Sequence, residues 1–323
     1  MFYNILMTRV HEYFTAQDLP SKLTARLPPI IKWSTAIALT AYPHVSPGIQ
    51  RVVAIFTVYL IAIDHLAGEI LDDLKQVARV LFKGQASENP LRRSFVRFLD
   101  DSISNAYGQF ATGMILKATL ESIAACYVEV ELEGAHALTL PPDARGFPYY
   151  LRLKTSIAEA YAFLAFPRDL YPDESHFRGY LLAIPELTYF FKAVNDIFSF
   201  YKESIVRDET GNFVCNVAVV NAVSPLRALE DICQKTIRVT QRVRCFLSMM
   251  PGMQRDIEHL VQGYIPYHLS QTRYRLVELD IHEAWEAGDL MKATLFEHRK
   301  SSQSGEQRAV GHGRECSGQP SVA

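Results

Sequence analysis

The longest apolar run of the chain, VVAIFTVYLIAI at residues 52–63, is twelve residues long. A helix that spans a bilayer needs about 20 apolar residues, so we expect no membrane span here. Ser46 and Pro47 precede the run, and this pair is typical of a helix start because serine caps the first turn and proline fits its first position. The run therefore predicts a core helix that continues towards Leu81, and such a helix must be enclosed by others.

Most other segments carry helical signals as well, and neither strand alternation nor a repeat of about 20–50 residues is visible. We therefore expect a single all-α domain over residues 1–300. The Ser-, Gly- and Gln-rich end predicts a disordered tail over 301–323. The further expected helices are 29–41, one from 90, 106–131, 149–166, one from Pro185 through residue 203, 225–250, 252–268 and 270–297.

Charge and cysteine content exclude several classes of protein. The 323 residues carry a formal net charge of −2, so no global basic field for nucleic acid exists. The five cysteines show no CxxC spacing and no spacing to histidine typical of zinc sites. No secretory leader is recognisable at the N-terminus, and a cytoplasmic protein with reduced thiols is expected.

The segment NDIFSFYKE, residues 195–203, places Asn195, Ser199 and Glu203 at four-residue intervals. Each step of four advances about 40° around a helix, so the three side chains share one stripe. Their oxygen atoms suit a hard cation, and Mg²⁺ is the default. Lys202 and the aromatic neighbours indicate a phosphate-bearing apolar substrate. The alternative is that Asn195 and Ser199 bond locally while Glu203 marks an exposed helix end.

This segment resembles the (N,D)D(L,I,V)x(S,T)xxxE metal motif of class I terpene cyclases, and its extended form is similar to fungal trichodiene synthases and their relatives. The resemblance implies a diphosphate-sensing arginine upstream, which matches Arg152, 43 residues before Asn195. It also implies an Arg-Tyr pair near the C-terminal end, which matches Arg273 and Tyr274 in HLSQTRYRL. The similarity extends over about residues 45–290.

The family also has a metal-binding aspartate, for which the chain offers several candidates. Asp64 directly follows the apolar run and lies 131 residues before Asn195, which is the separation that the resemblance implies. Asp100 and Asp101 lie about 95 residues before Asn195 and follow a basic amphipathic segment. Asp64 is therefore the expected ligand, and Asp100 and Asp101 are expected on a solvated helix face. The pair at 72–73 is expected on the surface, with an accessory role near the site left open.

The aspartate-rich motif departs from the family pattern, since it reads DHLAGE. His65 replaces the second aspartate, which in relatives accepts a hydrogen bond from the late arginine when the site closes. A neutral imidazole cannot serve as a second carboxylate. Either Asp64 alone bridges two metals, or metal affinity and closure are weakened. Glu69 lies about 140° from Asp64 on a regular helix, so whether it compensates stays open.

The resemblance implies a helical bundle around an apolar cavity that is open at one end. Asp64, Asn195, Ser199 and Glu203 would hold three Mg²⁺, and farnesyl diphosphate would ionise and cyclise to a sesquiterpene hydrocarbon or alcohol. Relatives often form homodimers, which the sequence does not decide. The residues implied to bind the diphosphate are Arg152, Lys202, Arg273 and Tyr274. Candidate cavity-lining residues are Phe56, Tyr59, Phe190, Phe191 and Phe198, for each of which ordinary core packing is the alternative.

Two rival functions remain at this point. A chain-elongating prenyl diphosphate synthase would need two DDxxD motifs, whereas the second motif here is of the Asn/Ser/Glu type. A non-catalytic isoprenoid-binding protein of the same fold would explain the altered first motif.

Overall fold

The computed structural model describes residues 2–85, 87–132 and 138–290, so the predicted tail at 301–323 lies outside the described residues. Helices and no strands form this part of the chain, which confirms the all-α prediction. The helices are α1 (Phe2–Thr15), α2 (Ser21–Thr24), α3 (Leu27–Ala41), α4 (Pro47–Leu66), α5 (Leu71–Phe82), α6 (Pro90–Phe98), α7 (Ser104–Ala106), α8 (Gln109–Glu131), α9 (Phe147–Thr155), α10 (Ala158–Leu164), α11 (Asp173–Phe200), α12 (Phe213–Asn221), α13 (Pro225–Leu247) and α14 (Pro251–Ser270). Short turns of other helical types cover Leu99–Ile103, Tyr201–Val206, Thr272–Tyr274 and Leu276–Leu279.

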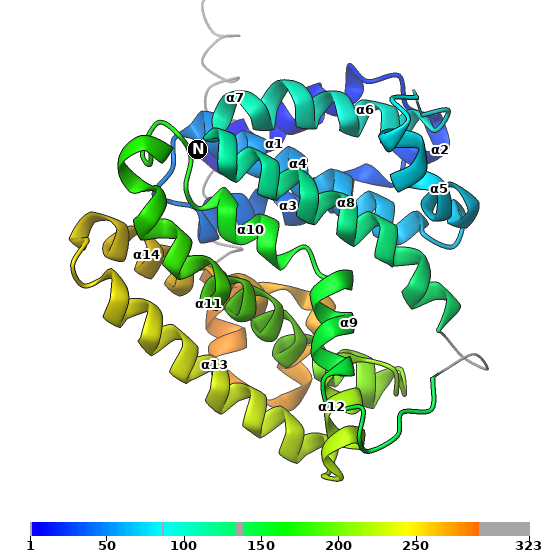
Figure 1. The fold of residues 1–323 in the computed structure, drawn as a ribbon, viewed down its shortest axis with the longest axis vertical. Coiled ribbons are helices and arrows are strands. Elements are labelled where there is room, and N and C mark those ends of the chain that lie inside the picture. Colours follow the sequence, from blue (N-terminus) through cyan, green and yellow to red (C-terminus); the bar gives the residue numbers. More distant parts are fainter. Residues whose placement is uncertain (1, 86, 133–137, 291–323) are drawn as a thin grey trace, which may run out of the picture.

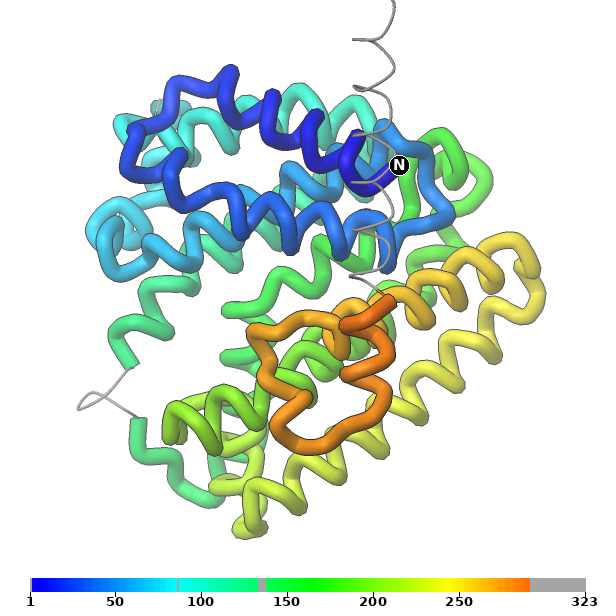
Figure 2. The backbone as a smooth tube through the Cα atoms, turned by 180° about the vertical axis from the view of Figure 1, so that it is seen from behind, coloured from blue at the N-terminus to red at the C-terminus, as the bar shows by residue number. Residues whose placement is uncertain are grey.

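The helices form two stacked groups (Figure 1). Helices α1 to α7 make one group, α11 to α14 make the other, and α8 and α10 lie between them. Helix α14 packs against α3 so closely that a Cβ at Gly263 would lie 1.6 Å from the Thr40 carbonyl oxygen. This approach brings the segment after α14 against the N-terminal group, and Figure 2 shows it crossing the back of the molecule.

Helix α4 begins as predicted, with the Ser46 hydroxyl accepting a hydrogen bond from the Ile49 amide. The expectation that it continues towards Leu81 is wrong, because it ends at Leu66 and α5 begins at Leu71. Gly68 lies in the break, and glycine is a poor helix former. The break places Asp64 in the last turn of α4, where its side chain is exposed.

The 20 residues of α4 are also long and apolar enough to cross a membrane, with a mean hydropathy of 1.5 in the most apolar window. In this fold 56% of that window is buried inside the protein. Helix α4 packs against α1, α3, α6 and α8, as expected for a core helix.

Three other boundaries differ from the sequence predictions. The expected helix at 149–166 is divided into α9 and α10, with extended backbone at Ser156. Pro185 does not open a helix but lies inside α11, on an exposed position where the missing N–H is tolerated. The expected helix from 270 is interrupted up to residue 281, because Arg275 and Asp280 adopt left-handed conformations with φ of 59° and 55°.

Aromatic side chains fill the interior between the two groups. Four of the five candidate cavity-lining residues, Phe56, Tyr59, Phe190 and Phe191, are 0–2% exposed and pack in the core. Phe198 alone of the five is partly exposed.

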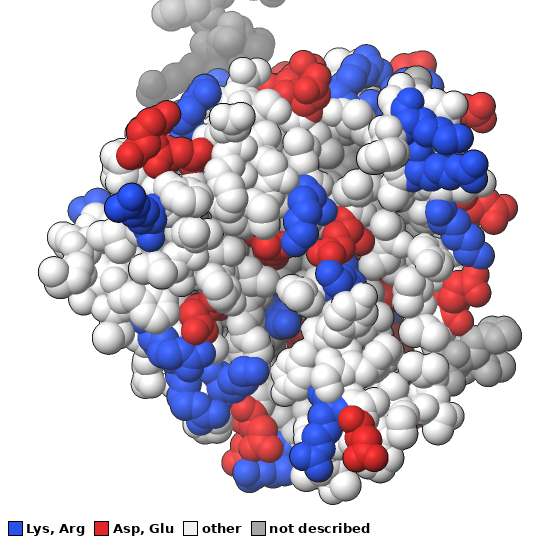
Figure 3. Space-filling view, in the orientation of Figure 1, with Lys and Arg blue, Asp and Glu red and all other residues white. Residues whose placement is uncertain are grey.

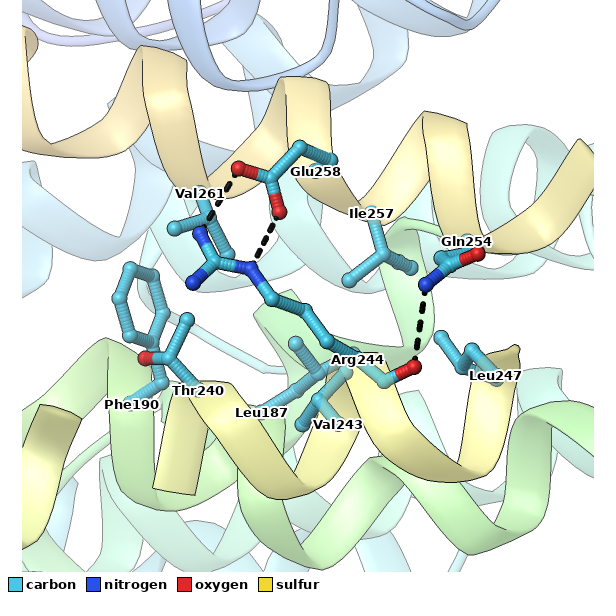
Figure 4. A pocket seen from close by; sticks show the side chains of 10 residues that line it. All are labelled: Leu187, Phe190, Thr240, Val243, Arg244, Leu247, Gln254, Ile257, Glu258 and Val261. Atoms are coloured by element: carbon cyan, nitrogen blue, oxygen red, sulfur yellow. Dashed lines mark hydrogen bonds and ion pairs between the residues drawn. The ribbon is translucent and has the colours of Figure 1, made fainter. Parts of the chain in front are cut away.

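A small apolar pocket lies between α11, α13 and α14, beside the ion pair of Arg244 and Glu258 (Figure 4). A second, open hollow lies between α5 and α8. Neither is lined by a predicted site residue.

Basic and acidic side chains are mixed over the face shown in Figure 3. This pattern agrees with the net charge of −2 and offers no continuous basic surface on that face for nucleic acid.

Candidate functional site

The three predicted metal ligands lie at the C-terminal end of α11. Asn195 and Ser199 are in its last two turns, and Glu203 follows in the wider π-helical turn Tyr201–Val206. The regular helix assumed from the sequence therefore ends at Phe200. Ser199 and Glu203 remain side by side despite the change of helix type, because the Ser199 hydroxyl donates a hydrogen bond to Glu203 Oε2 over 3.0 Å. Wide turns of this kind often occur at functional sites.

Arg152 reaches this stripe from α9. Its Nη2 lies 2.8 Å from Asp196 Oδ1, its Nε donates to both Asp196 oxygens, and Nη2 also donates to Asn195 Oδ1 over 3.3 Å. The Asp196 side chain is 9% exposed. Burial lowers the pKa of the guanidinium, but Asp196 more than offsets this effect and leaves the pKa above its usual range. The structure thus brings the predicted sensor arginine onto the predicted metal motif.

Lys202 and Tyr274 complete this group. Lys202 Nζ lies 3.0 Å from Glu203 Oε1, and the Asn195 amide donates to the Tyr274 hydroxyl over 3.2 Å. Tyr274 is held by ring stacking on His268, which in turn stacks on Phe198. The oxygens of Asn195 and Glu203 are therefore each contacted by a cation that the resemblance assigns to the diphosphate.

Asp64 lies on the opposite side of the same region, at the end of α4. Its carboxylate is exposed and forms no hydrogen bond or ion pair with another described residue. Two neighbours connect it to the α11 side. The charges of Asp64, Arg273 and Lys202 all act on His65, and those of Asp64, Arg152 and Asp196 all act on Glu129. Charges from Asp64 and from the α11 side therefore act on the pKa values of the same two side chains, His65 and Glu129.

The competing acids are located elsewhere or are already paired. Glu69 forms ion pairs with Lys22 of α2 at 3.2 Å and with Arg26, which precedes α3, at 2.7 Å, so the carboxylate that was considered as a substitute ligand is already paired. Asp73 pairs with Arg92 at 2.8 Å. Asp72 is exposed, on the helix that follows the break.

Asp100 and Asp101 are exposed in the π-helical turn Leu99–Ile103, between α6 and α7 and shortly before α8. The 23 residues of α8 then extend about 33 Å towards the region of Asp64, so these two acids lie at the other end of that helix.

Sequence reasoning missed two acids of the site. Asp196 follows Asn195 directly, yet its role in holding Arg152 depends on α9, far away in the sequence. Glu129 lies near the end of α8 and is exposed. Burial raises its pKa, Arg152 opposes the shift, and Asp64 and Asp196 add to it. Nothing local in EVELEG signals this.

Comparison with known proteins identifies the family. The model of the family described as trichodiene synthase (TRI5) matches residues 10–302. The chain belongs to this family. It is 38% identical over 274 residues to (E)-beta farnesene synthase of Metarhizium brunneum, covering 85% of this chain and 82% of that protein. It is 29% identical over 249 residues to alpha-cuprenene synthase COP6 of Coprinopsis cinerea, covering 77% of this chain and 74% of that protein.

Solved structures support the fold. Linalool/nerolidol synthase from Streptomyces clavuligerus, solved in complex with 2-fluorogeranyl diphosphate, superposes with a TM-score of 0.60 at 16% identity, covering 82% of this chain and 98% of that one. The predicted helical bundle of the class I terpene synthases is thereby confirmed. The relatives are terpene synthases by name, which agrees with the prediction of a carbon–oxygen lyase acting on phosphates.

Proposed function

We propose that this member of the trichodiene synthase family is a Mg²⁺-dependent sesquiterpene synthase that ionises farnesyl diphosphate and cyclises the resulting allylic cation. One observation carries the proposal. The oxygen donors Asn195 and Glu203 and the cations Arg152 and Lys202 form one hydrogen-bonded group at the end of α11, with Tyr274 attached to it. Such a group suits a site that binds metal ions and a diphosphate together.

The residues fit the expected metal. Asn195, Ser199 and Glu203 offer only oxygen atoms, and the Ser199 hydroxyl and a Glu203 oxygen are 3.0 Å apart. No group of three acidic, His or Cys side chains in the described part could hold an ion by itself. Mg²⁺ suits a site with few protein ligands, because it keeps water or phosphate oxygens in its coordination shell. We infer that Asp64 holds Mg²⁺ from the other side, and we propose three ions.

Mg²⁺ would supply Lewis-acid stabilisation of the departing diphosphate. The chain's own residues have three tasks around it. Arg152, Lys202, Arg273 and Tyr274 donate hydrogen bonds to diphosphate oxygens and so favour the charge that develops as the C–O bond breaks. The stacked rings of Phe198, His268 and Tyr274 exclude water beside the cation. Because Arg152 contacts Asn195 and Lys202 contacts Glu203, both cations lie beside the proposed metal ligands before the site is loaded.

Incubation with farnesyl diphosphate and Mg²⁺, followed by gas chromatography of an organic extract, tests the function. We expect a sesquiterpene hydrocarbon or alcohol that is absent without metal. Glu203→Ala should reduce turnover at least about a hundredfold because it removes a ligand from a pre-arranged group. Glu230→Ala, an exposed glutamate that pairs with Arg227 on α13, is the control and should leave turnover unchanged.

The outcome also decides between the enzyme and the isoprenoid-binding alternative. Binding of farnesyl diphosphate in calorimetry with no terpene product in the extract would support the non-catalytic protein. Equal turnover by Glu203→Ala and the unaltered protein would refute the metal-binding role of the α11 stripe.

A further inference from the structure

Arg273 is held by two aromatic rings. The centre of its guanidinium lies 5.5 Å from the centroid of the Trp33 ring and 5.3 Å from that of Tyr274. Trp33 belongs to α3 and is partly buried, whereas Tyr274 follows Arg273 in the turn Thr272–Tyr274. Within the described part of the chain the Arg273 side chain forms no ion pair and no hydrogen bond, so no described residue uses its five N–H donors.

His65 lies beside this arrangement. Its ring centroid is 6.4 Å from that of Trp33, at an interplanar angle of 78°, and the charge of Arg273 acts on it. His65 occupies the position at which the sequence departs from an Asp-Asp pair. This α4 position beside Trp33 offers an imidazole and no carboxylate, while Glu69, the next acid along the chain, is paired with Lys22 and Arg26.

We propose that Trp33 is a positioning residue for Arg273, and that its ring, together with that of Tyr274, holds the guanidinium at the site in place of a carboxylate. This inference rests on the proposed function, in which Arg273 binds the diphosphate. The close packing of α14 on α3 at Gly263 brings Trp33 within reach, since it fixes the segment after α14 against α3.

An aromatic partner differs from a carboxylate in how many N–H donors of Arg273 it leaves free. A carboxylate would orient Arg273 but would engage two of its N–H groups in a bidentate pair. An aromatic face attracts the cation through the ring quadrupole and leaves the N–H edge free. Arg273 can thus be ordered before the diphosphate arrives and still present all of its donors.

Tryptophan fluorescence provides a readout that packing alone would not change. The chain contains two tryptophans, Trp33 and Trp285, and Trp285 is half exposed. In a Trp285→Phe variant, Trp33 is the single emitter. We expect its emission to change when inorganic diphosphate and Mg²⁺ are added together, and to lose this response after Arg273→Met. A response that persists without Arg273 would overturn the proposal.

Calorimetric binding of inorganic diphosphate in the presence of Mg²⁺ gives the second test. Trp33→Leu keeps an apolar side chain but removes the ring, and it should weaken binding by about three- to tenfold, the range of a partly exposed cation–π contact. Trp33→Phe retains a ring face and should bind within about twofold of the unaltered protein. Equal affinity of Trp33→Leu and the unaltered protein would refute the positioning role.

A third experiment tests whether a carboxylate at position 65 can replace the Trp33 ring in holding Arg273. In a His65→Asp background an ion pair can hold Arg273, so Trp33→Leu should then cost less than about twofold, and the double-mutant cycle should show coupling. Additive effects would overturn the proposal.

The tests distinguish a failure of this inference from a failure of the proposed function. If the unaltered protein shows no Mg²⁺-dependent diphosphate binding, the proposed function is refuted. If it binds and Trp33 has no influence, only this inference fails.

Discussion

The two sides of the candidate site are built in different ways. On the α9–α11 side, Arg152, Asn195 and Asp196 are already joined by hydrogen bonds, and Lys202 is paired with Glu203. On the side of α4 and the segment after α14, Asp64 and Arg273 have no ion-pair partner among the described residues. One side is therefore pre-arranged by charge pairs, whereas the other depends on helix packing and aromatic contacts. Losing a residue from the first side should affect stability, and losing one from the second should affect activity alone.

The largest expected effect concerns the buried pair. Asp196→Asn leaves the Arg152 guanidinium beside a neutral amide, and we expect a loss of about 3 kcal/mol in the free energy of unfolding. The lower end of the range for buried pairs applies because the Arg152 side chain is 20% exposed. Urea denaturation measures the change. The matched control is Glu186→Gln, which breaks the more exposed pair with Arg242 and should cost less than about 1 kcal/mol. Equal losses in both variants would contradict the comparison.

The next effect concerns the opposite side. Asp64→Asn should reduce turnover of farnesyl diphosphate about a hundredfold or more, with the free energy of unfolding nearly unchanged because its carboxylate is exposed and unpaired. Asp100→Asn changes an exposed aspartate in the turn between α6 and α7, serves as the control and should be silent in both assays. The reverse pattern would show that the metal-binding acid is Asp100.

A smaller effect is expected from the aromatic stack between the two sides. Burial lowers the pKa of His268 to about 4, the Tyr264 carbonyl opposes this shift and Arg273 adds to it. Because the unfolded chain binds a proton near pH 6.5 and the folded one does not until about pH 4, stability is complete above pH 6.5 and is lost as the pH falls. Between pH 8 and pH 5 the loss attributable to His268 should be about 2 kcal/mol.

Denaturation of His268→Gln at both pH values checks this expectation. The variant should show a smaller difference in unfolding free energy between pH 8 and pH 5 than the unaltered protein. His282→Gln, which changes an exposed histidine, should leave that difference as it is. An unchanged pH dependence in His268→Gln would mean that the stack accommodates a protonated imidazole.

Several features of this protein could be predicted from its sequence because they depend on local interactions. The Ser-Pro helix start at 46–47, the apolar run after it and the oxygen-bearing stripe at 195–203 depend on neighbours within one or two turns. Spacing and the resemblance also led to the prediction of Asn195, Ser199, Glu203 and Arg152 as site residues, and the structure brings these four side chains together. The helical fold and the family were predicted correctly, because periodicity and motif order are properties of the chain itself.

Contacts between distant segments decided the rest. The interior position of Pro185 in α11 and the wide turn that carries Glu203 were not visible in the sequence pattern. The pairing of Asp196 with Arg152 and the contact of Trp33 with Arg273 each join segments that are more than 40 residues apart. Sequence patterns report the period of a segment and the chemistry of its side chains. They do not report which remote surface will face those side chains, and that surface sets the partner of each charge at this site.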